Sequence, residues 1–404
     1  MGQRTGRADL PLHGGRVPPW LATRMAKLGR VIVEAIVLHE GRDAVLSRLA
    51  HPFWFQALGC VMGMDWHSSG ITTSVLGALK RGLDPVKDEL GLYVCGGRGK
   101  QSRKTPAELC ALGEKTGLDA APLVDTSRLV AKVDNTAVQD GFQIYLHSMI
   151  VGADGQWAVV QQGMDGDRGE ARRYHWLSDG LESFVDDPHQ AIDGKSRGAI
   201  VNLADRRSRA ARTACVSLVE EGPSRVLAAL REVAPVEQPQ LELIPHLHMP
   251  HHHDVRPKDV VERRLWASLS AADAAAPEDF ESLLLVPGVG PRTLRSLAMV
   301  SEVVHGAPSR FSDPARFSLA HGGKDGHPFP VPLDVYDATI RVWKDAVDRA
   351  SLGEKDKLSA LERLDREARR VEASVCEGPS VTEYIAQERR DSPKYRGRTV
   401  DGWA

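Results

Sequence analysis

The chain has 404 residues, a formal net charge of −2 and 42% hydrophobic residues, a composition typical of a globular protein long enough for two domains. The near-neutral charge excludes a uniformly basic surface, so any contact with nucleic acid must be a local patch. Five cysteines without a Cys-x-x-Cys pair argue against a disulfide framework or a zinc ribbon. No apolar run approaches the length of a membrane span, and 1–15 lacks a secretory signal. We therefore expect a cytoplasmic protein that does not contact membranes.

The first part of the chain predicts helices followed by a strand. Residues 20–50 and 71–81 place apolar side chains at a helical period, and 89–97 is a short apolar run of the kind that forms a strand. Asp65 and His67 lie on a loop just before the helix at 71–81, where the N–H groups of a helix N-terminus favour an anion.

A glycine-rich cationic loop is predicted at 96–106, directly after that strand. It contains three glycines and four Lys or Arg side chains and no acid. Backbone N–H groups, hydroxyls and cations at this density can wrap a phosphate, although the spacing is not that of a nucleotide P-loop. A solvated surface loop is the alternative interpretation. The candidate phosphate-contacting residues are Gly97, Arg98, Gly99, Lys100, Ser102, Arg103 and Lys104.

A β-hairpin is predicted next. Residues 143–151 and 156–164 read as two strands, and the Asp154-Gly155 pair between them is a strong hairpin signal. His147 falls inside the first strand.

Histidine and aspartate side chains near this hairpin are the candidate catalytic groups. We expect His147 to act as nucleophile or general base, with Asp140 orienting it. His67 is a second acid/base candidate, and Lys100 and Lys104 would hold the scissile phosphate. The alternative is a core histidine hydrogen-bonded to Asp140 or Tyr145. If the chemistry depends on Mg or Mn instead, the candidate oxygen ligands are Asp65, Asp140 and Asp154.

A connector rich in histidine and proline is expected at 236–270, ending in a helix. His251 and His253 would share one face of an extended segment and could hold a metal, but the prolines break helical ligand spacing. A solvated or phosphate-contacting connector is the simpler interpretation.

Two helices joined by a tight turn are predicted at 277–305. The first, 277–286, has one apolar face, and the turn 287–290 contains two glycines that can adopt backbone angles forbidden to other residues. Pro291 suits the first turn of the second helix, whose N–H groups favour an anion. This pattern is typical of a helix-hairpin-helix, which holds a nucleic-acid backbone without reading bases, with Val289 as the apolar residue packing the turn. A turn between two core helices is the alternative. The candidate DNA-binding residues are Gly288, Val289, Gly290, Arg292, Thr293 and Arg295.

The predicted fold class is an α+β or α/β N-terminal domain with a small sheet, followed by an all-α C-terminal domain. The N-terminal catalytic domain covers 1–235, the connector covers 236–270, and the helical DNA-binding domain with a basic tail covers 271–404.

Over nearly its whole length the chain resembles a bacterial and archaeal family known as the domain of unknown function number seven hundred and sixty-three. The segments that carry the resemblance are GMDWHSSGITTSVLGALK, CGGRGKQSRKTP, VDNTAVQDGFQIYLH, WAVVQQGMD, MPHHHDV, VPGVGPRTLRSLA and AHGGKDG. The resemblance implies an N-terminal domain of its own kind, a helix-hairpin-helix region and suspected nuclease activity.

A weaker likeness connects the hairpin to phospholipase-D-type nucleases. His147-Ser148-Met149, followed by four residues and Asp154, matches their His-x-Lys-x4-Asp spacing, with Met149 in the lysine's place. The Gly, Ser and Asn that these enzymes carry in the second strand are absent from their places. The lysine would have to come from elsewhere: Lys100, Lys104 or Lys132.

The sequence therefore predicts a DNA nuclease that hydrolyses phosphodiester bonds in repair or processing, with either no cofactor or Mg or Mn. A non-catalytic DNA-binding scaffold is the main alternative. A base-excision glycosylase, with Asp334 or Asp337 as its catalytic acid, is a weaker one. A homodimer is plausible if a phospholipase-D-like half-site must pair.

Overall fold

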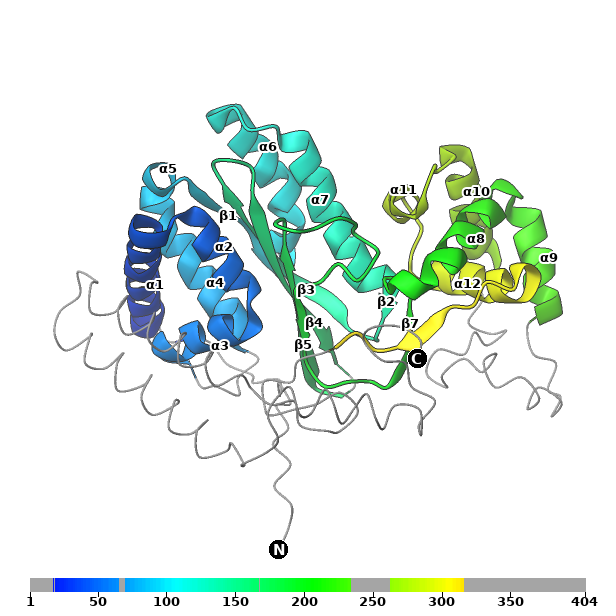
Figure 1. Ribbon diagram of the computed structural model, residues 1–404, viewed down its shortest axis with the longest axis horizontal. Helices are drawn as coiled ribbons and strands as arrows, with labels where there is room; N and C mark the ends of the chain where they lie inside the picture. The colour runs from blue at the N-terminus through cyan, green and yellow to red at the C-terminus, as the bar shows by residue number, and fades with distance from the viewer. Residues whose placement is uncertain (1–16, 18, 65–69, 167, 234–261, 316–404) are drawn as a thin grey trace, which may run out of the picture.

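The computed structural model describes residues 17, 19–64, 70–166, 168–233 and 262–315. Within them the chain forms a mixed α+β fold built on a small antiparallel sheet, as expected from the sequence. Helices cover both faces of the sheet, and a further group of helices extends the molecule on one side (Figure 1). No helix in these described ranges is both long enough and apolar enough to cross a lipid bilayer.

The main sheet has five strands in the order β1-β3-β4-β5-β6, and every neighbouring pair is antiparallel. The strands are β1 (Leu92–Arg98), β3 (Gln143–Gly152), β4 (Trp157–Asp165), β5 (Glu170–Leu177) and β6 (Ala191–Asp193). The predicted hairpin is confirmed, because β3 and β4 pair from Val151 opposite Trp157 onward. Asp154 closes its turn by accepting a hydrogen bond from the backbone N–H of Gln156 at 3.1 Å.

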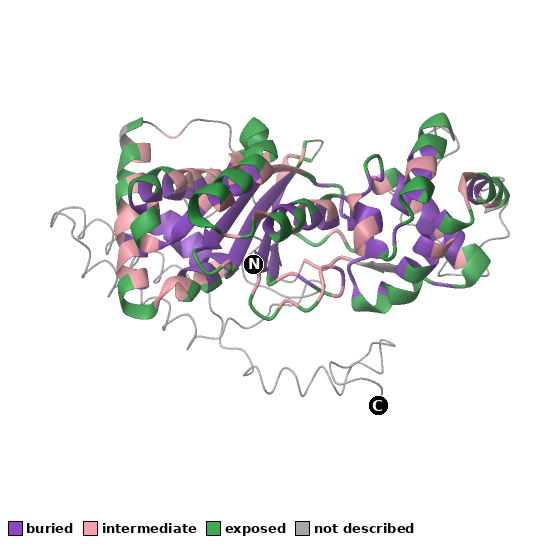
Figure 2. Ribbon diagram, turned by 90° about the horizontal axis from the view of Figure 1, so that it is seen from above, coloured by how far each residue is buried: buried purple, intermediate pink, exposed green. Residues whose placement is uncertain are grey.

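One face of this sheet is covered by the N-terminal helices. These are α1 (Pro19–Glu40), α2 (Arg42–Ala50), α3 (Pro52–Val61) and α4 (Gly70–Leu83), and the short α5 (Lys87–Leu90) then leads into β1. Their apolar faces form one core with the strand residues Ile150, Val160 and Leu177. The helical periodicity of 20–50 and 71–81 therefore marks the surfaces that cover the sheet. Figure 2 shows the strands buried between the flanking helices.

The opposite face is covered by α6 (Thr105–Thr116) and α7 (Ala120–Lys132). A π-helical turn, Val133–Ala137, continues α7 and leads into β2 (Val138–Gln139). This strand belongs to a second, three-stranded sheet with β7 (Ala199–Asn202) and β8 (Arg310–Ser312). Residues 271–404 are predicted from the sequence to be all-helical, but their described part includes one short strand, β8.

Beyond α7 lies a group of five helices. They are α8 (Arg209–Glu220), α9 (Pro223–Val233), α10 (Glu262–Ala275), α11 (Phe280–Leu285) and α12 (Pro291–His305). A single hydrophobic core extends from Val159 in the main sheet through Leu218 in α8 to Val300 in α12. The α11–α12 pair is therefore packed on α7, on α8 and on the π-helical turn that leads into β2.

Candidate functional site

The turn between α11 and α12 has the geometry needed to present backbone N–H groups. Gly288 has φ +92°, a left-handed conformation that favours glycine. Val289 is only 1% exposed and anchors the turn in the core, as expected. Gly290 is the N-cap of the 15-residue α12, with φ −138° and ψ −175°, and offers no side-chain cap. A Cβ built on Gly290 would meet no atom within 4 Å, so the first turn of α12 is open to an approaching group.

Polar side chains from α7 and β2 donate hydrogen bonds to backbone carbonyl groups of this turn. Lys132 Nζ donates to the carbonyl of Val289 at 2.7 Å, and Gln139 Nε2 donates to the carbonyl of Pro291 at 2.9 Å. Burial lowers the pKa of Lys132. These bonds connect the turn to residues about 150 positions earlier in the chain, and periodicity in the sequence gives no signal for them.

The three predicted DNA contacts on α12 face different ways. Arg292 is exposed. Thr293 is 4% exposed, and its hydroxyl donates to Ser268 Oγ on α10 at 3.2 Å. Arg295 is half-buried, and its Nε donates to Gln139 Oε1 at 3.0 Å. Thr293 and Arg295 are therefore committed to packing contacts, because the apolar face of α12 brings these flanking positions against neighbouring elements.

The cationic segment at 96–106 is ordered rather than a loop. Strand β1 continues to Arg98, and a 3-10 helix follows from Gly99 to Lys104. Ser102 Oγ donates to the carbonyl of Gly99 at 2.6 Å. Gly96 has φ +86°, and a Cβ there would lie 2.3 Å from the carbonyl oxygen of His147. All four cationic side chains of this segment are exposed: Arg98, Lys100, Arg103 and Lys104.

His147 lies at the centre of a buried hydrogen-bond chain beneath this segment. It is 4% exposed and sits opposite Gly97 in the β1–β3 register. Its Nδ1 is 2.9 Å from Gln161 Oε1, and its Nε2 is 2.9 Å from Ser127 Oγ on α7. The expected partners Asp140 and Tyr145 are not the ones it contacts, because the ring points from β3 towards α7.

The partners of Gln161 fix the tautomer of His147. Gln161 Nε2 donates to Asp134 Oδ2 at 2.5 Å, so Gln161 Oε1 must accept from His147 Nδ1–H. His147 Nε2 is then the acceptor of the Ser127 hydroxyl proton. Burial lowers the pKa of His147, outweighing the hydrogen bond to Gln161 and the charge of Asp134. Burial therefore favours the neutral imidazole, whose basic nitrogen faces a serine.

Asp134 is the acidic end of this chain. It lies in the π-helical turn and is fully buried. Besides Gln161 it accepts hydrogen bonds from Trp176 Nε1 at 2.9 Å and from His189 Nε2 at 2.5 Å. The sequence gives no signal for this role of Asp134, because none of these three partners is a sequence neighbour.

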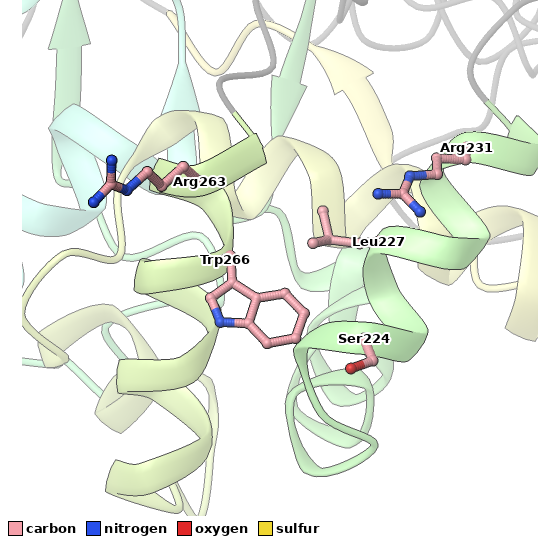
Figure 3. A pocket seen from close by; sticks show the side chains of 5 residues that line it. All are labelled: Ser224, Leu227, Arg231, Arg263 and Trp266. Atoms are coloured by element: carbon pink, nitrogen blue, oxygen red, sulfur yellow. The ribbon is translucent and has the colours of Figure 1, made fainter.

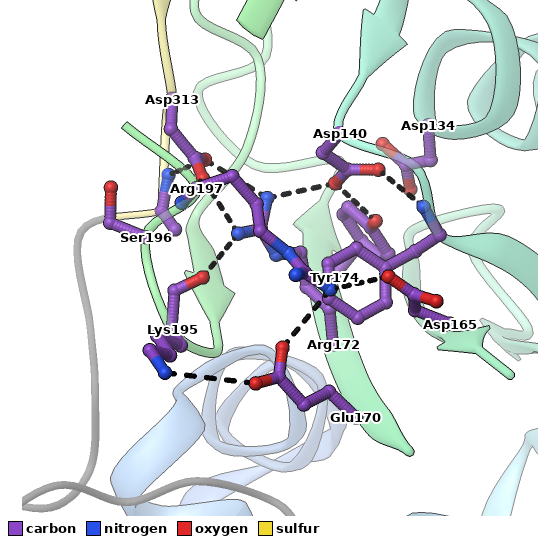
Figure 4. Close-up of polar contacts among 12 residues, drawn as sticks. Asp134, Asp140, Asp165, Glu170, Arg172, Tyr174, Lys195, Ser196, Arg197 and Asp313 are labelled. Atoms are coloured by element: carbon purple, nitrogen blue, oxygen red, sulfur yellow. Dashed lines mark hydrogen bonds and ion pairs between the residues drawn. The ribbon is translucent and has the colours of Figure 1, made fainter. Parts of the chain in front are cut away.

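Asp140 belongs to a different cluster, so the expectation that it orients His147 is wrong. Its Oδ2 accepts from Arg172 Nη1 at 2.8 Å and from Tyr174 Oη at 2.6 Å. Arg172 also donates twice to Asp313, at 2.9 and 2.7 Å. Figure 4 shows this guanidinium between the carboxylates of Asp140 and Asp313. Burial alone would lower the pKa of Arg172, but the two carboxylates raise it.

The charged segment 170–177, which the sequence does not indicate as a strand, forms β5 and lies between β4 and β6 in the main sheet. In β5, Arg172 and Tyr174 face the Asp140 cluster, whereas Arg173 and His175 face the N-terminal helices. Arg173 is fully buried and donates to Asp193 at 2.6 Å and to Gln56 at 2.8 Å. The aromatic residues of this segment favour a strand. Its charged residues are of a type usually found at the surface, so the sequence does not indicate that this strand is buried.

The proposed metal ligands do not come together in the part of the chain that the structure describes. Asp140 precedes β3 and Asp154 follows it, so they lie at opposite ends of a ten-residue strand, roughly 30 Å apart by strand rise. The described residues contain no group of three or more His, Cys, Asp or Glu that could hold a metal ion. The candidates that lie outside the described residues are Asp65, His67, His251, His253, Asp334 and Asp337.

Comparison with known proteins identifies the family. Neither the curated proteins nor the solved structures include a match to this chain. The family model described as "Protein of unknown function (DUF763)" matches residues 6–331, which is most of the chain and includes both His147 and the α11–α12 turn. The chain therefore belongs to the DUF763 family.

Proposed function

We propose that this protein binds DNA through the turn between α11 and α12, which acts as a helix-hairpin-helix. The observation that carries the proposal is the uncapped N-terminus of α12 at Gly290, next to the left-handed Gly288 and above the buried Val289. The first N–H groups of a helix have no intrahelical partner and attract an anion. A backbone phosphate is the anion that a turn without side chains can approach closely.

Two cations add to this site. Arg292 is exposed in the first turn of α12. Lys132 donates to the carbonyl of Val289 and so places a second cation next to the turn. A contact of this kind positions the backbone of DNA and does not distinguish base sequences.

The matched variants Gly290→Asp and Gly290→Asn test this proposal. The backbone of Gly290 is extended and its Cβ position is open, so both side chains fit and both are favoured N-caps. We expect each variant to be at least as stable as the wild type. They differ only in charge, and opposite a phosphate at about 4 Å the aspartate costs about 1 to 4 kcal/mol.

Binding is measured by fluorescence anisotropy with labelled DNA over a range of salt concentrations. Gly290→Asp should weaken binding at least about five-fold more than Gly290→Asn and should reduce the salt dependence. Equal affinities for the two variants would show that no phosphate lies at Gly290, and no DNA binding by the wild type would refute the function itself.

Phosphodiester cleavage is a second proposal, with His147 as general base. The observation that favours it is the neutral imidazole, whose Nε2 is the acceptor nitrogen, beneath a segment with four exposed cations. The ring is 4% exposed, so a substrate can reach it only if α7 shifts.

Labelled single- and double-stranded DNA incubated with EDTA, Mg or Mn tests this second proposal. His147→Ala should abolish cutting while leaving DNA affinity within about 1 kcal/mol. Cutting that persists in the variant would refute the role of His147. If the wild type cuts DNA in none of these buffers, cleavage is refuted and the remaining function is that of a non-catalytic DNA-binding scaffold.

A further inference from the structure

A hollow of about 460 Å³ lies between α9 and α10, on the surface of the helical group. The residues that line it are Ser224, Leu227, Arg231, Arg263 and Trp266. Figure 3 shows the indole of Trp266 extending from α10 towards Leu227 and Ser224 of α9. The hollow therefore combines one flat aromatic ring with a hydroxyl and arginine side chains.

The exposure of Trp266 is not explained by the packing of α10. The apolar face of this helix buries Leu265, Leu269 and Ala272, which are 7%, 1% and 0% exposed. Trp266 lies next to that face and is 45% exposed. Trp is one of the residues that gain most from covering its aromatic surface, so an exposed indole in a hollow is suited to a ligand with a planar ring.

Helix α10 also supports the phosphate-binding turn proposed above. Ser268, two residues after Trp266, accepts a hydrogen bond from Thr293 of α12 at 3.2 Å. A Cβ built on Gly288 would lie 3.7 Å from the Cβ of Ser268. One short helix thus carries both the support of the turn and the exposed indole.

We propose that this hollow binds an unpaired base of single-stranded DNA, stacked on Trp266, with Arg263 close to the flanking phosphates. The inference rests on the proposed DNA binding and specifies its substrate class. Aromatic stacking tolerates any base, because every base has a π-face, and arginine supplies the charge that a strand requires. A base pair within a duplex cannot stack in this way, because its faces are covered by its neighbours.

Trp266→Ala tests this proposal, with Leu38→Ala as the control. Leu38 is 78% exposed on α1, so its variant also loses exposed apolar surface, at a site remote from the hollow in sequence. Three labelled probes of equal length are compared: an unstructured deoxythymidine strand, the same strand with every base replaced by an abasic site, and a blunt duplex. Thermal unfolding shows that each variant is folded, and Trp266→Phe retains a stacking ring.

We expect Trp266→Ala to weaken binding of the deoxythymidine strand by about five-fold to about a hundred-fold. Its affinities for the abasic strand and the duplex should stay within about two-fold of the wild type, since the abasic strand has no base and the duplex covers every base face except those at its two ends. Trp266→Phe should recover part of the loss, and Leu38→Ala should change nothing.

Equal losses on all three probes, or no loss on the deoxythymidine strand, would overturn the proposal. Failure of the underlying function is distinguishable, because Gly290→Asp would then leave binding of the duplex unchanged. If Gly290→Asp weakens duplex binding while Trp266→Ala binds the deoxythymidine strand like the wild type, the turn remains the DNA-binding site and base stacking in the hollow is refuted.

Discussion

Replacing Arg172 should reveal how strongly the fold depends on one buried cation. Its side chain is 0% exposed and pairs with two carboxylates, Asp140 and Asp313, whose side chains are 0% and 1% exposed. Arg172→Met keeps much of the volume but removes the charge. It leaves both carboxylates buried without their cation, which is the situation that costs about 3 to 5 kcal/mol of stability.

The matched variant Asp140→Asn should cost less. It leaves Arg172 with both hydrogen bonds to Asp313 and with the carbonyl of Lys195. The asparagine oxygen can take the place of Oδ2 and accept from Arg172 and Tyr174, but its NH2 group then faces the backbone N–H of Phe142, which donates to Asp140 Oδ1 at 3.0 Å. The loss is then one hydrogen bond to a charged group, about 1.5 to 3 kcal/mol. Combining the two substitutions should cost less than the sum of the single changes, because Asp140→Asn removes one of the carboxylates that Arg172→Met leaves unpaired.

Urea unfolding followed by circular dichroism measures these differences. The deficit of Arg172→Met should shrink as the pH falls, because burial raises the pKa of Asp140 and its protonation removes a buried unpaired charge. The folded-state pKa of Asp140 lies above its unfolded value, so the folded chain binds this proton more tightly than the unfolded chain. The stability that this proton contributes is present at low pH and is lost as the pH rises. A loss of less than about 1 kcal/mol, or a loss no greater than that of Asp140→Asn, would refute the assignment of this cluster as a buried electrostatic anchor.

Further predictions concern the histidines, the cationic segment and metal dependence. Burial lowers the pKa of His147 and His175 below 6.5, so the unfolded chain takes up protons that the folded chain does not. The free energy of unfolding should therefore fall below about pH 6.5, by up to about 1.4 kcal/mol per histidine per pH unit, and a flat urea midpoint from about pH 7 to pH 5 would contradict this. Gly96→Ala should cost more than about 2 kcal/mol, since a Cβ there meets the His147 carbonyl; Gly99→Ala, with φ +59° but open space, should cost about 1 kcal/mol in the same unfolding assay. If DNA is cut, cutting that survives EDTA would favour His147, whereas cutting only with Mg or Mn would require ligands other than Asp140, which Arg172 occupies.

The sequence by itself determined the local elements of the structure. The Asp154-Gly155 pair set the β3–β4 hairpin, because this turn chemistry suits the twist of paired strands. The apolar Val289 between two glycines indicated a turn anchored in the core, and this residue is 1% exposed. Pro291 marked the start of α12 because proline fits the first turn of a helix. Each of these signals depends on residues within a few positions of one another.

Only the tertiary structure decided the partners of the candidate catalytic groups. Periodicity shows which face of β3 carries His147, but not that Ser127 of α7 and Gln161 of β4 would meet it there. It shows nothing of the pairing between Arg172 and Asp313, which are 141 residues apart. The physical reason is that a buried polar group needs a hydrogen-bond partner but does not specify which one. The packing of helices on the sheet makes that choice, and here it separated His147 from Asp140.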